Sequence, residues 1–151
     1  MSYGVRIFDE KEIELNEPVW GKWRAGGVSY TTIEKSASSP DAFDIVKHDA
    51  ATGEKTILVD ASHLIPDGAE GPLEIKDYSW SDDGQFMLIS TNTAKFRRNE
   101  SLGDYWLLNR DNWSLRQVGV AAKPSTLMYA KFSPDSQYIA YMFANNIYVE
   151  S

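Results

Sequence analysis

Two stretches of the chain repeat one order of apolar, turn-forming and apolar residues. Residues 78–90 read Tyr-Ser-Trp-Ser-Asp-Asp-Gly-Gln-Phe-Met-Leu-Ile-Ser, and residues 129–141 read Tyr-Ala-Lys-Phe-Ser-Pro-Asp-Ser-Gln-Tyr-Ile-Ala-Tyr. In both, an aromatic residue ends one strand-like stretch, a polar turn follows, and an aromatic residue opens an apolar run, as in a β-hairpin. With Trp80 aligned to Phe132 the period is about 50 residues, which is in the range of propeller blades. The pattern therefore predicts repeated antiparallel units.

Three such units divide most of the chain, at about 18–60, 74–119 and 127–151. Each is built from short runs rich in aromatic and β-branched residues, separated by Gly, Pro, Asn or Asp. The expected strands are 18–23, 28–34, 43–48 and 55–59, then 75–80, 86–91, 104–108 and 114–118, then 127–132, 138–143 and 146–149. Residues 92–103 are expected to form a long connection within the second unit, and residues 61–72 a crossover with one short helical turn.

No long window sustains the apolar stripe of an amphipathic helix. The fold class predicted is therefore all-β, a partial β-propeller of about two and a half four-stranded antiparallel blades, with residues 1–151 as a single partial propeller domain. A closed propeller needs at least four blades, so exposed blade faces and strand edges are expected. The expected partners are the remainder of the propeller or, in its absence, other copies of the chain.

Composition and charge exclude several classes of function. The 42% hydrophobic content suffices for a modest core, and the formal net charge of -7 argues against a nucleic-acid partner. The chain has no Cys and no apolar run of the ~20 residues that a membrane span needs. Residues 82–84, Asp-Asp-Gly, lack the spacing of a calcium loop and are expected to form a hairpin turn. No metal and no cofactor are expected.

Three stretches carry a resemblance to a known family. The first comprises residues 23–34 and 44–53; the second is residues 96–106, Phe-Arg-Arg-Asn-Glu-Ser-Leu-Gly-Asp-Tyr-Trp; the third is residues 125–135 with 145–150. Together they resemble the N-terminal propeller of dipeptidyl peptidase IV, in the prolyl oligopeptidase superfamily of serine peptidases, and particularly its bacterial members.

The resemblance implies a role in recognition rather than in bond cleavage. In that family the propeller caps an α/β-hydrolase domain, and the enzyme releases Xaa-Pro or Xaa-Ala dipeptides from peptide N-termini. The hydrolase carries the Ser, Asp and His; the present sequence has no Gly-x-Ser-x-Gly elbow. No catalytic residue and no activity are expected from this chain alone. The resemblance further implies an α/β-hydrolase domain as partner and a periplasmic or secreted parent enzyme.

Arg97 is the candidate substrate-binding residue. Phe96-Arg97 matches the family's Trp-Arg pair by position, with Phe in place of Trp, and the family's arginine holds the carbonyl of the first substrate residue. A guanidinium carries five donors in a rigid fork and stays charged, which suits this task. Arg98 is the second candidate, and an ordinary loop arginine paired with Glu100 or Asp104 is the alternative without substrate contact. The family's paired glutamates, which bind the substrate ammonium, are expected beyond residue 151.

The remaining candidate chemistry is expected to be structural. His48 and His63 lie apart in the sequence, without neighbouring metal ligands, and the five tryptophans fall mostly in or beside predicted strands, where packing uses aromatics. A second hypothesis for the whole chain is a non-catalytic propeller scaffold for protein–protein interaction.

Overall fold

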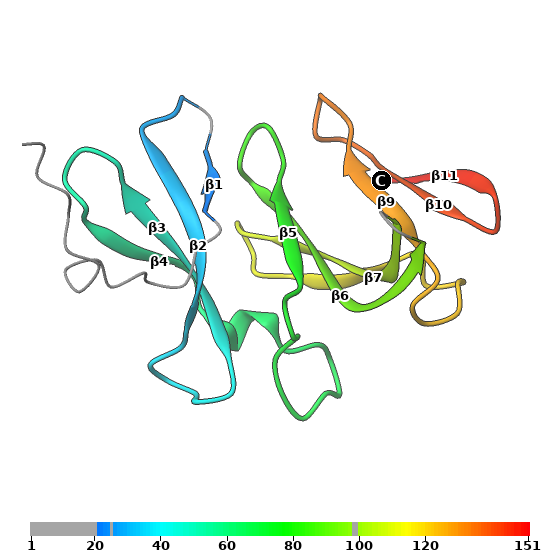
Figure 1. Ribbon diagram of the computed structural model, residues 1–151, viewed down its shortest axis with the longest axis horizontal. Coiled ribbons are helices and arrows are strands. Elements are labelled where there is room, and N and C mark those ends of the chain that lie inside the picture. Colours follow the sequence, from blue (N-terminus) through cyan, green and yellow to red (C-terminus); the bar gives the residue numbers. More distant parts are fainter. Residues whose placement is uncertain (1–20, 25, 98–99) are drawn as a thin grey trace, which may run out of the picture.

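Three antiparallel sheets follow one another along the chain in the computed structural model, which describes residues 21–24, 26–97 and 100–151 (Figure 1). The first sheet orders its strands β1 (Lys22–Trp23), β2 (Ser29–Lys35), β3 (Phe43–Asp49) and β4 (Lys55–Val59). The second orders β5 (Asp77–Trp80), β6 (Phe86–Arg97), β7 (Glu100–Asn109) and β8 (Leu115–Val118). In the third, β10 (Ile139–Phe143) lies between β9 (Met128–Phe132) and β11 (Asn146–Glu150). The predicted all-β, blade-like class is confirmed.

The repeated sequence motif forms the same turn in the second and third sheets. Ser81 Oγ donates to Asp83 Oδ1 at 2.6 Å and accepts from Phe86 N at 2.9 Å. Ser133 Oγ donates to Asp135 Oδ1 at 2.5 Å and accepts from Tyr138 N at 2.9 Å. These side chains replace missing ladder partners in the turn, which explains why the Ser-x-Asp spacing recurs.

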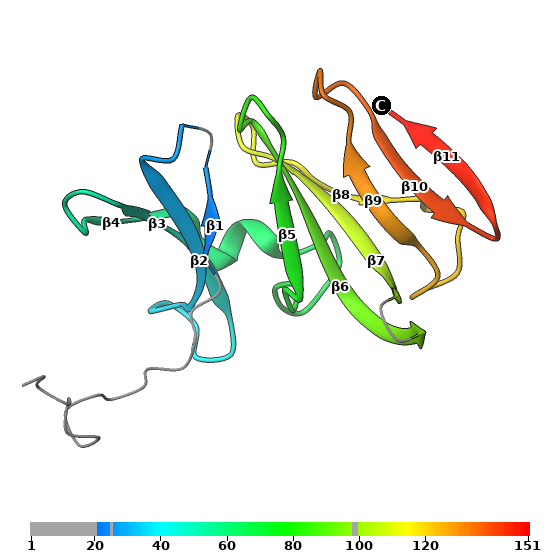
Figure 2. The same cartoon turned by 45° about the horizontal axis from the view of Figure 1, so that its top comes forward.

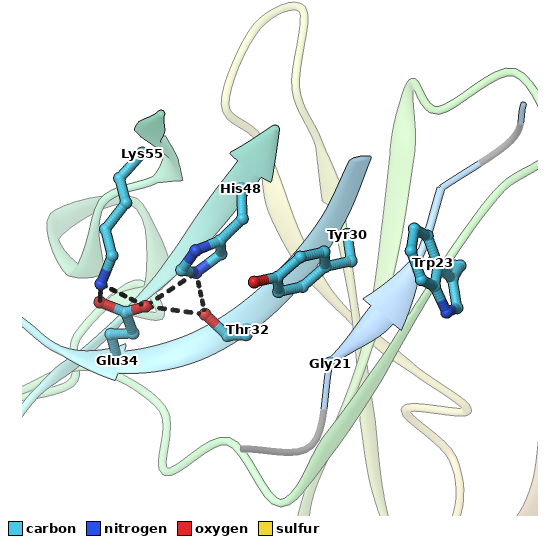
Figure 3. Close-up of a pocket in the computed structure, with 7 residues that line it drawn as sticks. All are labelled: Gly21, Trp23, Tyr30, Thr32, Glu34, His48 and Lys55. Carbon is cyan, nitrogen blue, oxygen red and sulfur yellow. Dashed lines mark hydrogen bonds and ion pairs between the residues drawn. The ribbon is translucent and has the colours of Figure 1, made fainter. Parts of the chain in front are cut away.

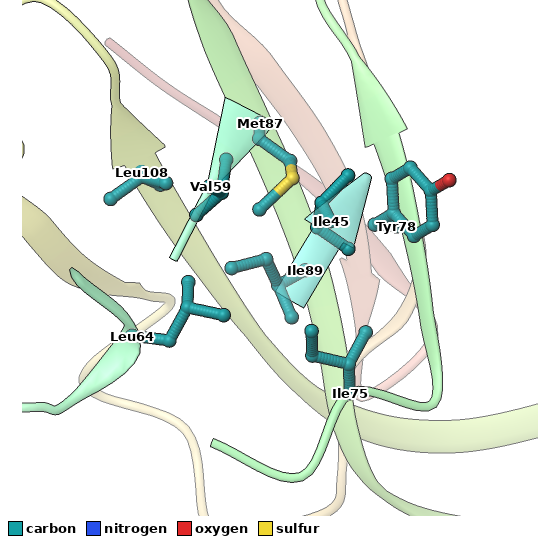
Figure 4. Close-up of a cluster of buried hydrophobic side chains, with 8 residues drawn as sticks. All are labelled: Ile45, Val59, Leu64, Ile75, Tyr78, Met87, Ile89 and Leu108. Carbon is teal, nitrogen blue, oxygen red and sulfur yellow. The ribbon is translucent and has the colours of Figure 1, made fainter. Parts of the chain in front are cut away.

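A short 3-10 helix, η1 (Ala61–Leu64), lies in the crossover from the first sheet to the second, as expected for that segment. Asp60 caps it by accepting from Ser62 N at 2.9 Å. The buried Leu64 side chain points from η1 into the space between the two sheets, so the crossover contributes to the core (Figure 4).

Two hydrophobic clusters hold the sheets face to face. The larger lies between the first and second sheets (Figure 4) and consists of Ile45, Val59, Leu64, Ile75, Tyr78, Met87, Ile89 and Leu108. The smaller lies between the second and third sheets and consists of Leu88, Val118, Leu127, Ile139 and Tyr141. Successive residues of a strand point to opposite faces, so Leu88 and Ile89 enter different clusters. The second sheet is thus covered on both faces.

The prediction of a long connection at residues 92–103 is wrong in one respect. β6 and β7 continue through most of it as a two-stranded hairpin, with register shifts between Thr91 and Ala94 and between Lys95 and Arg97. Asn92, Thr93 and Ala94 are exposed, so this part of β6 has no buried face. A strand without a buried face shows no alternation of apolar and polar residues, which is why the pattern suggested a loop.

Candidate functional site

The β6–β7 hairpin projects beyond the rest of the second sheet (Figure 2). β5 pairs with β6 only as far as Ser90, and β8 pairs with β7 only from Tyr105 onward, so the hairpin is two-stranded beyond these points. Arg97 is the last residue of β6 and its backbone pairs with Glu100. The structure thus places the backbone of Arg97 near the tip of a projecting hairpin. Arg98 lies outside the described residues.

A compact polar network fastens the base of this hairpin to the segment that leads into the third sheet. Asp104 Oδ1 accepts from Ser125 N at 2.7 Å, and Asp104 Oδ2 accepts from Asn92 Nδ2 at 2.8 Å. Ser125 Oγ donates to Asn92 O at 2.5 Å. Hydrogen bonds in which the acceptor is a carboxylate are stronger than neutral ones. We refer to Asn92, Asp104 and Ser125 as the hairpin brace.

Backbone geometry at the brace is specialised. Asn92 has φ 49° and Ser125 has φ 54°. Both lie in the left-handed region of the backbone, which residues other than Gly, Asn and Asp seldom adopt. Gly103 and Leu127 exchange two backbone hydrogen bonds, at 2.9 and 3.1 Å. A Cβ on Gly103 would lie 3.1 Å from Thr91 O, closer than most Cβ contacts, so a larger residue here would push against the neighbouring strand. The brace and this bridge together fix the hairpin where it leaves the sheet.

The sequence had suggested Asp104 only as an ion-pair partner of an arginine, and it did not suggest Asn92 or Ser125 at all. Their convergence joins segments 21 and 33 residues apart. The one local signal was Gly103 beside Asp104, which marks a point of close backbone approach in a strand.

A cavity of about 430 Å³ lies on the face of the first sheet that points away from the second (Figure 3). His48 Nε2 lies 2.8 Å from both Thr32 Oγ1 and Glu34 Oε1, and Lys55 Nζ lies 3.2 Å from Glu34 Oε2. Tyr30 stacks on the His48 ring with centroids 4.7 Å apart. Burial raises the pKa of Glu34, but hydrogen bonds from Lys55 and Thr32 outweigh it and hold this pKa below its usual value. His48 is buried, stacked and bonded through Nε2, which accords with a structural role.

His63 lies elsewhere and stacks on Trp113 at a centroid distance of 3.9 Å. Within residues 21–24, 26–97 and 100–151, His, Asp and Glu side chains form no cluster of three that could hold a metal ion. No helix in that same part of the chain is both long and apolar enough to cross a membrane.

Comparison with known proteins gives consistent matches. Residues 81–151 match the family described as the dipeptidyl peptidase IV N-terminal region. Dipeptidyl peptidase 4 of Felis catus is 32% identical over 78 residues, which cover 51% of this chain and 10% of the cat protein. Dipeptidyl aminopeptidase B of Saccharomyces cerevisiae is 28% identical over 96 residues, which cover 64% of this chain and 11% of the yeast protein. The chain therefore spans about a tenth of the length of these relatives.

The fold also has a counterpart among solved structures. The crystal structure of Porphyromonas gingivalis dipeptidyl peptidase 4 superposes with a TM-score of 0.72 at 18% sequence identity, over 87% of this chain and 17% of that protein. At this identity the likeness supports the fold, and the sequence matches support the family. Taken together, they show that the chain is similar to the N-terminal region of dipeptidyl peptidase IV-like proteins, with the family match confined to residues 81–151.

Proposed function

We propose that the chain forms part of the substrate-recognition propeller of a dipeptidyl peptidase that releases Xaa-Pro and Xaa-Ala dipeptides. In this proposal Arg97 holds the backbone carbonyl oxygen of the first substrate residue, and peptide-bond cleavage belongs to an α/β-hydrolase domain of the same protein. The observation that carries the proposal is the braced, projecting β6–β7 hairpin, which lies within the family match and bears Arg97 near its tip.

The hairpin suits this role for a physical reason. A substrate arginine contributes to catalysis by fixing the position of the peptide, and an error of about 1 Å in that position is costly. A two-stranded hairpin by itself is only marginally stable in water and moves unless other contacts hold it. Asp104 supplies that hold by joining Asn92 on β6 to Ser125 before β9. The brace would thereby limit the movement of Arg97 relative to the rest of the sheet.

The outer faces of the first and third sheets carry exposed large apolar side chains. Trp23 and Ile57 are exposed in the first sheet, and Ile147 and Val149 are exposed in the third. Apolar patches of this kind mark surfaces that another element covers. We propose that the remainder of the propeller covers them, that copies of the chain associate when it does not, and that the complete protein acts in the periplasm or after secretion. The comparisons do not favour the alternative of a non-catalytic scaffold.

Substitution of Arg97 in the complete protein tests the proposal. Arg97→Ala removes a charged donor to the substrate carbonyl, so KM for a Pro-containing dipeptide substrate should rise about tenfold or more. Arg98→Ala removes the same charge one residue away and distinguishes the two candidates: it should leave KM nearly unchanged, and a rise in KM for Arg98→Ala alone would transfer the role to Arg98. Steady-state kinetics measures both, with circular dichroism to verify folding. Unchanged kinetics for Arg97→Ala would remove Arg97 from substrate binding.

A further inference from the structure

Two arginines from different sheets converge on one tryptophan at the interface between the first and second sheets. Arg24 follows β1 and Arg110 follows β7, and their guanidinium carbons lie 4.9 and 5.5 Å from the Trp80 ring centroid. The two groups also meet at Gly84, since Arg110 Nη1 donates to Gly84 O at 3.0 Å and a Cβ on Gly84 would lie 2.8 Å from Arg24 Nη2. The aromatic face attracts both cations, but it neutralises neither.

Within the described residues, neither arginine has a carboxylate within ion-pair distance. Arg24 Nη1 and Arg110 Nε are buried and find no hydrogen-bond partner among the residues that the structure describes. Burial is the main cause that lowers the pKa of Arg24, and the nearby positive charge of Arg110 lowers it further. Buried unpaired donors are costly and rare, and each requires a physical explanation such as a bound ion.

A cavity of about 430 Å³ opens beside this pair. Lys22 and Arg24 line it together with Trp80 and the turn that contains Asp82 and Asp83. The Asp83 carboxylate forms its hydrogen bonds within its own turn, because Oδ1 accepts from Ser81 Oγ and Gln85 N. The cavity thus offers a guanidinium, an indole ring and room for a small ligand, and the Asp82 side chain also lines it. Arg110 is not part of the lining, but it donates to the carbonyl oxygen of Gly84, which is.

We propose that Arg24 and Arg110, stacked on Trp80, form a binding site for an oxyanion with two or more acceptor oxygens, a carboxylate or a phosphate group. A planar guanidinium matches such groups with two parallel hydrogen bonds, and a second positive charge nearby becomes favourable once an anion lies between them. The bound group satisfies donors that are now unpaired. The site is separate from Arg97, because Gly84 and Arg110 lie in the turns at the opposite end of the β6–β7 ladder.

Calorimetric titration of the complete protein with inorganic phosphate, at constant ionic strength set with chloride, tests the site. Saturable binding is expected, with affinity lowered about tenfold or more in Arg24→Gln and in Arg110→Gln. Lys123→Gln is the matched control, because Lys123 is exposed in the connection between the second and third sheets and its removal costs the same charge. If Lys123→Gln lowers the affinity for phosphate equally, the effect comes from overall charge and the proposal is overturned.

A crystal structure of the complete protein distinguishes the two sources of the anion. If dissolved phosphate does not bind because a carboxylate side chain of the protein already occupies the site, that carboxylate will be seen against Arg24 and Arg110. This outcome supports the site and assigns its occupant. The proposal is overturned if phosphate does not bind and no acidic group contacts either guanidinium.

Discussion

Removing the Asp104 carboxylate should release the β6–β7 hairpin from the third sheet. Asp104→Ala eliminates the bonds from Ser125 N and Asn92 Nδ2, each of which would contribute about 1.5–3 kcal/mol to stability if fully buried. Asp104 and Ser125 are half-buried and Asn92 is exposed, so values toward the lower end apply. The docking of the hairpin should therefore weaken by about 2–3 kcal/mol.

Hydrogen exchange in the complete protein measures this loss directly. Gly103 N and Leu127 N donate to each other's carbonyl oxygens beside the brace, and they report whether the hairpin base is docked. A loss of about 2–3 kcal/mol corresponds to exchange roughly 30- to 150-fold faster at both amides. Asp135→Asn is a suitable control, since Asp135 also accepts two hydrogen bonds, in the β9–β10 turn, and should leave these two amides unchanged.

Kinetics shows whether this docking matters for substrate binding. If Asp104 acts by positioning Arg97, Asp104→Ala should raise KM in the wild-type background and have little effect once Arg97 is already Ala. Unchanged exchange at Gly103 and Leu127 would refute the brace. Additive effects on KM in the double variant would refute its link to Arg97.

Two further predictions concern stability. Gly103→Ala places a Cβ 3.1 Å from Thr91 O and should lower the free energy of unfolding by about 1–3 kcal/mol, measured by urea denaturation; wild-type stability would contradict the close approach. The pKa of Glu34 is lowered in the folded protein, so the stability it contributes is present above its ordinary value of 4.5 and is lost as pH falls through the folded pKa. In Glu34→Gln the free energy of unfolding should therefore fall less steeply as the pH is lowered. If it falls as steeply as in the wild type, other carboxylates cause the loss of stability in acid.

The repeated hairpins were predictable because their chemistry is local. Ser81 and Asp83 in one turn, and Ser133 and Asp135 in the other, bond to backbone atoms within a few residues, so the sequence order carries the geometry. The apolar run from Met87 likewise predicted a strand, and the structure buries both of its faces.

The candidate sites were less predictable, because they depend on contacts between distant segments. Asp104 meets Ser125 only when the second and third sheets pack, and Arg24 meets Trp80 only when the first and second do. The extension of β6 toward Arg97 was missed for a different reason. Asn92, Thr93 and Ala94 are all exposed, so the apolar pattern that reveals strands is lacking there.

The most direct test of the proposed role of Arg97 is a crystal structure of the complete protein with a bound peptide that carries Pro at its second position. This role places the Arg97 guanidinium within hydrogen-bond distance, about 2.7–3.2 Å, of the carbonyl oxygen of the first peptide residue. It also predicts that Asp104 still bonds to Ser125 and Asn92 in that complex. A peptide held by other residues, with Arg97 pointing into solvent, would contradict the proposed role of the hairpin.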